Sequence, residues 1–352
     1  MKNHINFGST NLFDNVVKNI NHLVKYNGLD ENGKQTYIQR ECPTIEVVGS
    51  EKIHGTNFTI GYNLIDGIWF QSRSSIITPQ ADNAGSAFWG EAKKDVLINI
   101  IEKLASNYNI DLKQNTILLC GEWAGQGVQS KSACDGLTKK YFLFQHFKVS
   151  PMDEDDKIKG TYWEETKIND VWIDNIKNDI YNVMNFPTYK LNIDFNNPKL
   201  YVNKMIEIVD KIEENSPVGQ FFGIQGNIGE GVVFSFKYKD QVFKWKVKGE
   251  KHSKTKVKQL KPVDNEKEQI KIDLANQVTP AWRLEQMFDL ANDVINGGIP
   301  DARNMGAFMK LLIGDVIKEE SDKIVEKGLE IKDISSKISQ IAKVWYFEQL
   351  VK

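Results

Sequence analysis

The sequence predicts an α+β protein in which antiparallel sheets flanked by helices are followed by a small all-helical domain. Up to about residue 265, short apolar or alternating runs are broken by Gly, Asn and Asp, a pattern typical of strands in hairpins. A polar stretch from Pro262 to Glu268 then precedes a purely helical pattern. We therefore expect a strand-rich domain over residues 1–261, a linker over 262–272 and a helical domain over 273–352.

The first domain contains seven clear strand patterns and two helical ones. The strands are Thr44–Val48, Asn57–Tyr62, Ile68–Ser72, Thr116–Cys120, Tyr141–Val149, Gly231–Lys237 and Gln241–Val247. The helices are Glu91–Ser106 and Lys199–Glu214, and the acidic stretch 151–160 is expected to be an exposed loop. Because the strands come as hairpin-like neighbours, antiparallel pairing is favoured over repeated βαβ units.

The second domain begins with Thr279 as a helix N-cap and Pro280 at the first helical position. A helical stripe follows, and Gly297-Gly298 is expected to end it. In the last helix the spacing of Ile334, Ile338, Ile341 and Trp345 predicts one buried face.

Composition excludes several classes of protein. The chain has 352 residues, a net charge of −2 and 41% hydrophobic residues, so it is long enough for two folded domains and is not disordered. Its three cysteines form no C-x-x-C pair, which argues against a disulfide framework or a structural zinc site. There is no membrane-length apolar run, and the polar start lacks a signal-peptide pattern. We expect an intracellular, cytoplasmic protein and, without a long heptad pattern, a monomer.

The most informative motif is residues 51–58, Glu-Lys-Ile-His-Gly-Thr-Asn-Phe. A lysine followed three residues later by glycine, here Lys-Ile-His-Gly, is typical of enzymes that form a lysyl-nucleotide bond. That chemistry requires an unprotonated amine, which burial or nearby cations favour. Lys52 is the candidate nucleophile, and we expect Gly55 to let the backbone approach the nucleotide. By residue type alone, Lys52 would more often be a surface lysine.

Further candidates follow in chain order. Arg73 follows a short strand and suits phosphate or ribose oxygens. Glu122 and Gln129 lie in a glycine-rich turn after an apolar strand, and Phe144 lies in the next strand, where it would stack on a purine or simply pack in the core. Glu230 stands between two glycines at the start of another strand, where a nucleotide and a metal ion can approach. Each has an ordinary structural alternative, and it is their combination that indicates nucleotide chemistry.

Lys244, Lys246 and Lys248 alternate with apolar residues on a predicted strand and therefore share one face. Three like charges on one face suit an anion, although a solvated face is the commoner reason for such a run. The region 237–261 contains ten lysines against Asp240 and Glu250, which makes it a candidate nucleic-acid track.

These motifs together resemble the RNA ligase 2 family, the phage double-stranded-RNA nick-sealing type related to the trypanosome RNA-editing ligases. The resemblance rests on Lys-Ile-His-Gly-Thr-Asn-Phe, Gly-Glu-Trp-Ala-Gly-x-Gly-Val-Gln, Glu-Gly-Val-Val and Lys-Trp-Lys, and it covers the helical domain only weakly. DNA ligases usually have aspartate at the position of His54. The resemblance implies that residues 1–261 are an adenylyltransferase domain.

The resemblance also implies roles for individual residues. Lys52 would carry AMP with His54 as an essential neighbour, and Phe144 would stack on adenine. The remaining nucleotide-binding residues would be Glu51, Asn57, Arg73, Glu122, Glu230, Lys244 and Lys246, with Glu230 also serving the metal. Gln129, Arg283 and Asp315 would contact RNA. The sequence departs from the family at Gln145, where aspartate is common, and at Ser50 and Ser72, where basic residues are common.

From these features we expect an ATP-dependent RNA ligase. It would join 5′-phosphate and 3′-hydroxyl ends, in nicked duplex RNA, through lysyl-AMP and adenylylated RNA. ATP and Mg²⁺ would be the cofactors, with Mn²⁺ as a substitute. The alternatives are a DNA ligase, a GTP-using capping type of enzyme, and an RNA-end-binding protein without activity. The Asn- and Lys-rich composition suggests an AT-rich genome, such as that of a phage.

Overall fold

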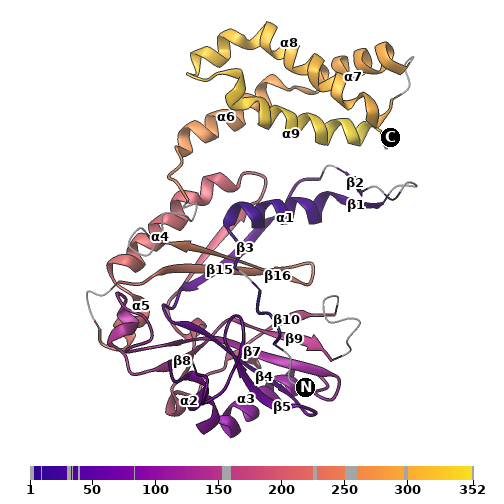
Figure 1. Ribbon diagram of the computed structural model, residues 1–352. Helices are drawn as coiled ribbons and strands as arrows, with labels where there is room; N and C mark the ends of the chain where they lie inside the picture. Colours follow the sequence, from indigo (N-terminus) through magenta and orange to yellow (C-terminus); the bar gives the residue numbers. More distant parts are fainter. Residues whose placement is uncertain are drawn as a thin grey trace. The chain divides into compact units, whose positions relative to one another are not determined.

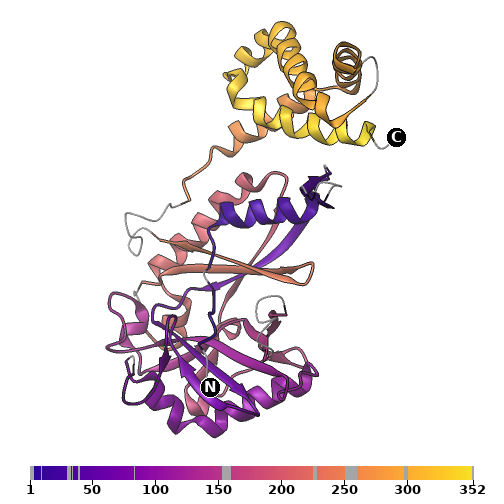
Figure 2. The same cartoon turned by 45° about the vertical axis from the view of Figure 1, so that its right-hand side comes forward.

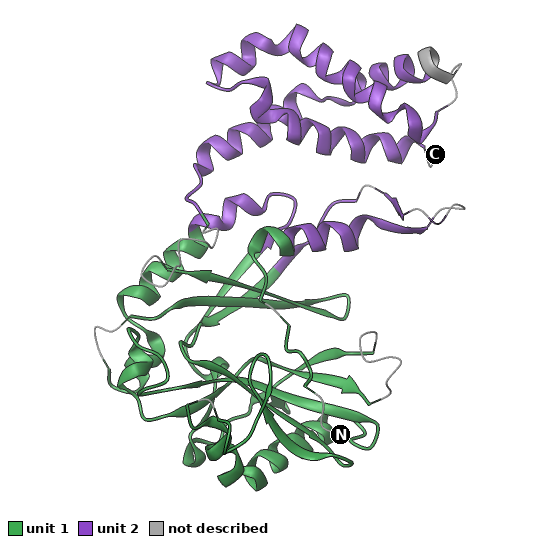
Figure 3. Ribbon diagram, in the orientation of Figure 1, with its two compact units in different colours: residues 1–16, 46–192, 204–260 green, residues 17–45, 193–203, 261–352 purple. Residues whose placement is uncertain are grey.

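The computed structural model describes residues 4–8, 10–29, 33, 35–38, 40–82, 84–152, 160–224, 228–249, 260–296 and 300–350, with backbone alone at 293–296 (Figure 1). The chain forms two compact units, each made of several segments (Figure 3). The first contains residues 1–16, 46–192 and 204–260, and the second contains residues 17–45, 193–203 and 261–352.

The larger sheet of the first unit is built around β7 (Asn115–Ala124). Its strand order is β10 (Tyr162–Glu165), β9 (His146–Pro151), β7, β4 (Thr56–Asn63), β5 (Gly67–Gln71) and β6 (Ile76–Ile77), while β8 (Lys140–Leu143) also pairs with β7 and β13 (Ile180–Asn182) with β8. Figures 1 and 2 show α2 (Ser86–Ala92) and α3 (Lys94–Asn107) on one side of this sheet. β7 is apolar at successive positions because both of its faces are buried: Ile117 and Leu119 face the helices, and Leu118 and Cys120 join a separate cluster on the opposite face.

A second sheet has the order β14 (Thr188–Asp194), β3 (Thr44–Glu51), β15 (Gly231–Tyr238) and β16 (Gln241–Lys248). Along β16 the burial alternates, with Phe243, Trp245 and Val247 buried. Trp245 packs against Phe13 and Phe234, with ring centroids 5.4 and 5.1 Å apart. This packing confirms the predicted alternation of β16, because it turns the three lysines of the strand to the other face.

The remaining elements are short strands and helices. They are α1 (Phe13–Lys25), β1 (Tyr26–Leu29), β2 (Gln35–Tyr37), β11 (Lys167–Ile168), β12 (Val171–Trp172), α4 (Val202–Glu214), α5 (Pro217–Phe221), α6 (Asn265–Val278), α7 (Ala281–Asn296), α8 (Met305–Glu326) and α9 (Ile331–Gln349). Short 3₁₀ turns cover 133–136, 176–178, 183–185, 198–201 and 302–304. Helices α6 to α9 share one apolar core that contains Ile334 and Ile338, as the spacing predicted. No helix in the described part of the chain combines the length and apolarity needed to cross a membrane.

The structure differs from the expected linker and from the expected cap of α7. Helix α6 occupies most of residues 262–272, because Asp264 caps it by accepting a hydrogen bond from the Lys267 amide (2.9 Å). Leu274, Ala275 and Val278 then bury its face in the helical core. The hydroxyl of Thr279 donates to the Ala275 carbonyl (2.7 Å) and so ends α6. Gly297-Gly298, most of the acidic loop and residues 250–259 of the lysine track lie outside the described residues.

The predicted strand Tyr141–Val149 is two strands, β8 and β9, with a break at Phe144 and Gln145. The break is stabilised from the side, because the Thr166 hydroxyl donates to the Phe144 carbonyl (2.7 Å) and the Thr166 amide to the Gln145 carbonyl (2.8 Å). In the same way Lys93 divides the predicted helix Glu91–Ser106 into α2 and α3. The first break has a consequence for the site, since it turns both Phe144 and Gln145 toward the same cavity.

Candidate active site

Lys52 follows directly after β3 and remains tied to the sheet, because its amide donates to the Gly231 carbonyl (2.8 Å). The chain then turns into β4 at Gly55. A Cβ atom at Gly55 would lie 2.3 Å from the Trp123 carbonyl oxygen. Glycine is therefore required for close packing of the loop on β7. Gly55 also lines the cavity that contains Lys52, so its expected role in the approach to a nucleotide stays a prediction.

The side chain of Lys52 belongs to a cluster of three basic side chains around one carboxylate. Lys52 Nζ lies 2.6 Å and His54 Nδ1 3.0 Å from Glu230 Oε2, and Lys248 Nζ lies 2.5 Å from Glu230 Oε1. Burial of Glu230 acts to raise its pKa, but the hydrogen bonds and charges of His54, Lys52 and Lys248 outweigh it and hold the pKa well below the usual range. Glu230 is therefore an ionised counter-ion of Lys52.

Lys244 and Lys246 complete the basic face of β16. Burial lowers the pKa of Lys244 to about 7, and its Nζ has no hydrogen-bond partner among the described residues. Instead the Nζ lies 3.5 Å from the ring centroid of Trp163, in a cation–π contact. The pKa of Lys246 is also lowered, first by burial and then by the charges of Lys248, Lys52 and Arg73. Within the described part of the chain neither amine forms an ion pair, which suits a ligand that brings negative charge.

These side chains line one cavity of about 360 Å³, which we call the lysine cavity. Its volume lies in the range of small-molecule sites. Its lining residues are Phe7, Gly8, Thr10, Ser50, Glu51, Lys52, Ile53, Gly55, Thr56, Asn57, Arg73, Glu122, Phe144, Gln145, His146, Val183, Val233, Ser235, Lys244, Lys246 and Lys248. All of the adenylyltransferase-domain candidates except His54, Glu230 and Gln129 are in this list, and the first two are bonded to Lys52 or to its partner.

The two carboxylates that line the cavity, Glu51 and Glu122, are held differently from Glu230. Glu51 is buried, and its carboxylate accepts hydrogen bonds from the Ser216 hydroxyl (2.5 Å) and the Val218 amide (2.9 Å), which fixes α5. Burial raises the pKa of Glu51 to about 7 despite these bonds. Burial likewise raises the pKa of Glu122 to about 7, although the charge of Lys52 opposes the shift. Glu122 can therefore change protonation near neutral pH.

Asn57, Arg73 and Phe144 reach the cavity from three places. Asn57 on β4 lies opposite Glu122 on β7 and donates weakly to the Gly121 carbonyl (3.4 Å). Arg73 is exposed at the mouth, two residues after β5. Phe144 packs obliquely against Phe7, with centroids 5.6 Å apart, and presents a half-buried ring to the cavity. A cation at the mouth and an aromatic surface inside suit phosphate and base respectively.

The three residues expected to contact RNA lie elsewhere. Gln129 is exposed in the loop after β7 and does not line the lysine cavity. Arg283 is 3% exposed, and its guanidinium pairs with Asp315 (2.9 Å) and Glu320 (2.8 Å) and donates to the Val278 carbonyl (2.7 Å). Such burial corrects the expectation of direct RNA contact by Arg283, whose place in the structure is an internal tie of α7 to α8. Asp315 remains partly exposed.

Several lining residues were not predicted. Phe7 belongs to a polar N-terminal segment whose Asn11 pairs with Trp245 on β16, and no sequence signal marks it. Trp163 does not line the cavity, but the pairing of β10 with β9 places its ring against Lys244, which does. Lys248 had been placed on the basic face of β16 by its spacing from Lys244 and Lys246. That spacing was the available signal for its ion pair with Glu230. Gln145 and Ser235 are distant in the sequence and come into contact because the two larger sheets pack together, which no local pattern indicates.

A lysine bonded to a buried carboxylate, a basic strand face and an aromatic surface around one cavity suit the binding of a nucleotide. The family model described as RNA ligase matches residues 45–246, more than half of the chain. The chain belongs to the RNA ligase family.

Solved structures of a Naegleria gruberi RNA ligase are similar in part. The form with PPi is 14% identical with a TM-score of 0.39, over 70% of this chain and 57% of that one. A lysine-to-alanine mutant with ATP and Mn is 15% identical with a TM-score of 0.35, over 59% and 50%. The chain thus spans little more than half of these ligases. None of the curated proteins compared with it matches.

Proposed function

We propose that this protein is an ATP-dependent RNA ligase that uses Lys52 as its nucleophile. The observation that carries the proposal is the lysine cavity. Lys52, paired with Glu230 at 2.6 Å, shares it with Lys244, Lys246, Lys248 and the aromatic ring of Phe144. Membership in the RNA ligase family supports RNA as the polynucleotide.

The chemistry follows from the groups in the cavity. Lys52 Nζ, once it has left Glu230 and lost its proton, attacks the α-phosphorus of ATP; an N–P bond forms and pyrophosphate leaves with the electrons of the broken P–O bond. Lys244, Lys246 and Lys248 neutralise charge on the phosphates, and this kind of positioning supplies most of the catalysis in phosphoryl transfer. An oxygen of an RNA 5′-phosphate then attacks the phosphorus of the AMP, and the N–P bond to Lys52 breaks. Finally an RNA 3′-hydroxyl attacks the 5′-phosphate, a phosphodiester bond forms and AMP leaves.

Glu122, which lines the cavity, and Glu230, which is bonded to Lys52 beside it, suit a metal that arrives with the phosphates. Both oxygens of Glu230 are bonded to cations, and the described residues contain no cluster of three or more His, Cys, Asp or Glu arranged to hold a metal. Mg²⁺ commonly takes one or two carboxylates together with substrate phosphates, and Glu122 and Glu230 fit that part. When bound, the ion would offset charge on the phosphate oxygens.

Sealing of nicks in duplex RNA, action as a monomer and a cytoplasmic location are proposed as well. In this proposal residues 1–261 carry the adenylyl transfer, and residues 273–352 hold the RNA during sealing. The family supports RNA in general, and the basic residues after β15 suit a phosphate backbone. A DNA ligase or a GTP-using enzyme remains the alternative for cofactor and strand.

The test is incubation with α-labelled ATP and Mg²⁺ followed by denaturing electrophoresis, beside Lys52→Ala. The protein is first treated with pyrophosphate, because a purified ligase can already carry AMP. Label on the unmodified chain alone supports the proposal, and absence of label would contradict it. Competition by ATP, GTP and NAD then defines the nucleotide. Nicked RNA and DNA duplexes define the strand.

A further inference from the structure

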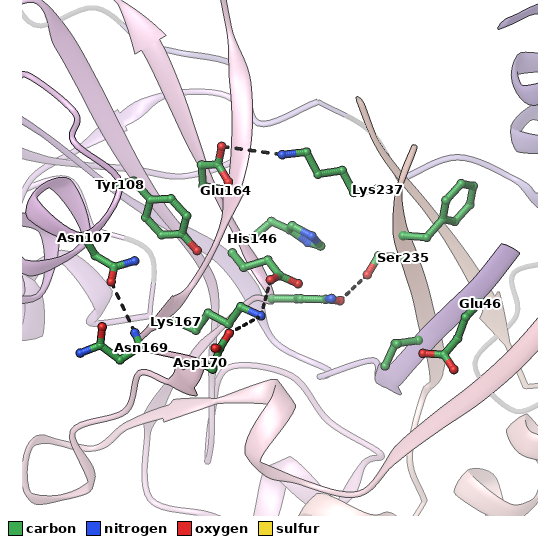
Figure 4. A pocket seen from close by; sticks show the side chains of 14 residues that line it. Glu46, Asn107, Tyr108, His146, Glu164, Lys167, Asn169, Asp170, Ser235 and Lys237 are labelled. Carbon is green, nitrogen blue, oxygen red and sulfur yellow. Dashed lines mark hydrogen bonds and ion pairs between the residues drawn. The ribbon is translucent and has the colours of Figure 1, made fainter. Parts of the chain in front are cut away.

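A second cavity of about 560 Å³ adjoins the lysine cavity, and we call it the rear cavity (Figure 4). The two cavities share three lining residues, Gln145, His146 and Ser235. The rear cavity is otherwise lined by residues that have no part in the lysine cavity, among them Val48 and Tyr108. The shared residues therefore form a wall between the two spaces.

One side-chain hydrogen bond closes this wall. The Ser235 hydroxyl on β15 donates to Gln145 Oε1, at the break between β8 and β9, so the bond joins the two sheets of the unit. The backbone carbonyl of Gln145 accepts hydrogen bonds from Thr166, whereas the carboxamide has no further hydrogen-bond partner among the residues that the structure describes. A single neutral hydrogen bond contributes little net stability, because its groups would otherwise bond to water. Displacing the Gln145 side chain would therefore open the wall at small cost.

The wall lies where the far edge of a nucleotide base is expected, and this step rests on the proposed function. If the phosphates of the nucleotide contact Lys52 and Lys246, the sugar lies close to these lysines and the base stacks on Phe144. In adenine the sugar bond is at N9, so the edge with N1 and the 6-amino group points away from the sugar. Gln145 is the next residue after Phe144 and lines the same cavity. That edge would therefore face the Gln145–Ser235 bond.

The chemistry of the wall suits an uncharged base. With the Ser235 hydroxyl donating to Gln145 Oε1, the Nε2–H₂ group of Gln145 can still donate to ring N1, and Gln145 Oε1 or Ser235 Oγ can still accept from the 6-amino group. His146 is 2% exposed and its Nδ1 has no partner among the described residues. Burial, with the charges of Lys244, Lys237 and Lys167, holds the pKa of His146 well below its usual range, so it is neutral. In Figure 4 its ring lies among the side chains that surround the rear cavity.

The rear cavity itself is polar but charge-compensated. Lys167 pairs with Glu165 (2.7 Å). Lys237 pairs with Glu164 (3.8 Å), and Figure 4 shows this pair. The aromatic rings of Tyr108 and Phe236 also line it. Such walls suit a neutral, flat substituent better than a phosphate.

We propose that Gln145 and Ser235 form the specificity-determining end wall of the nucleotide site, and that the rear cavity behind them accepts a substituent on the 6-amino group of adenine. The ligand class is thus N6-substituted adenine nucleotides. ATP would bind with the Gln145–Ser235 hydrogen bond intact, whereas an N6-substituted analogue would displace the Gln145 side chain and break that bond.

The test compares ATP with N6-benzyl-ATP, by calorimetric binding and by lysine labelling, in the full chain and three variants. Gln145→Ala removes the wall, and Val48→Phe narrows the rear cavity without touching the lysine cavity; the third variant combines them. We expect Gln145→Ala to improve N6-benzyl-ATP relative to ATP by roughly tenfold or more, and Val48→Phe to cancel that gain in the double variant while ATP binding persists.

An unchanged ratio in Gln145→Ala, or a gain that survives Val48→Phe, would overturn the inference. Failure of the proposed function looks different. If ATP binds but no lysine is labelled, the ligase proposal fails while the ratio of binding constants still decides the role of the wall. If ATP itself does not bind, both fail.

Discussion

Lys244 is a buried cation whose charge is expected to destabilise the folded protein when no ligand is bound. Its Nζ is buried and has no hydrogen-bond partner among the described residues, and burial lowers its pKa from 10.5 to about 7. Each pKa unit corresponds to about 1.36 kcal/mol, so the charge costs about 4 kcal/mol of folding free energy at pH 7. The cation–π contact with Trp163 offsets about 1–2 kcal/mol of this free-energy cost. Lys244→Met is therefore expected to stabilise the ligand-free protein by about 2 kcal/mol at pH 7.

The pH dependence gives this prediction its sign. Because the folded pKa lies below the unfolded pKa, the cost is fully present below pH 7, shrinks as the pH rises, and vanishes above 10.5. Thermal unfolding followed by circular dichroism should show the variant melting roughly 4–8 °C higher at pH 7, with the gap nearly closed by pH 10. Lys246→Met, at a half-buried site, serves as the control with a smaller gap. A variant that melts lower at pH 7, or a gap that does not change with pH, would refute the reasoning. Lysine labelling should nevertheless be lost in Lys244→Met.

Three further substitutions test the site and the helical unit. Glu230→Gln should lower stability by about 2 kcal/mol in chemical denaturation, because its charged hydrogen bonds are lost; the depressed pKa means that this difference persists above pH 4.5 and fades as the pH falls through the folded pKa. Gly55→Ala should cost about 1–3 kcal/mol and reduce labelling, since its Cβ meets a carbonyl at 2.3 Å, whereas Gly306→Ala, with nothing within 4 Å, should be neutral or stabilising in the same melts. Arg283→Ala should destabilise α7 and α8 by about 3 kcal/mol in hydrogen exchange and leave lysine labelling unchanged; equal protection in both proteins would remove its structural role.

The residues of the candidate site could be named from the sequence because several of them lie in short motifs. Lys52 and His54 lie within one octapeptide, and the alternation in residues 243–248 predicted a basic face from strand geometry alone. The helical region was predictable for the same reason, since the spacing of Ile334 and Ile338 reflects helical periodicity. The start of α6 was misassigned because the polar residues near Asp264 cap a helix, whereas in the sequence they read as a linker.

What the sequence determined by itself was thus the class of chemistry, the strands and helices with strong periodicity, and the residues that carry charge. The tertiary structure decided which of those residues meet. Glu230 reaches Lys52 across 178 positions, Gln145 reaches Ser235 across 90, and Arg283 is buried with partners in another helix. These contacts depend on strand order and on the packing of the sheets and helices. Local sequence pattern reports burial and periodicity, but it carries no information on which distant segment supplies the partner.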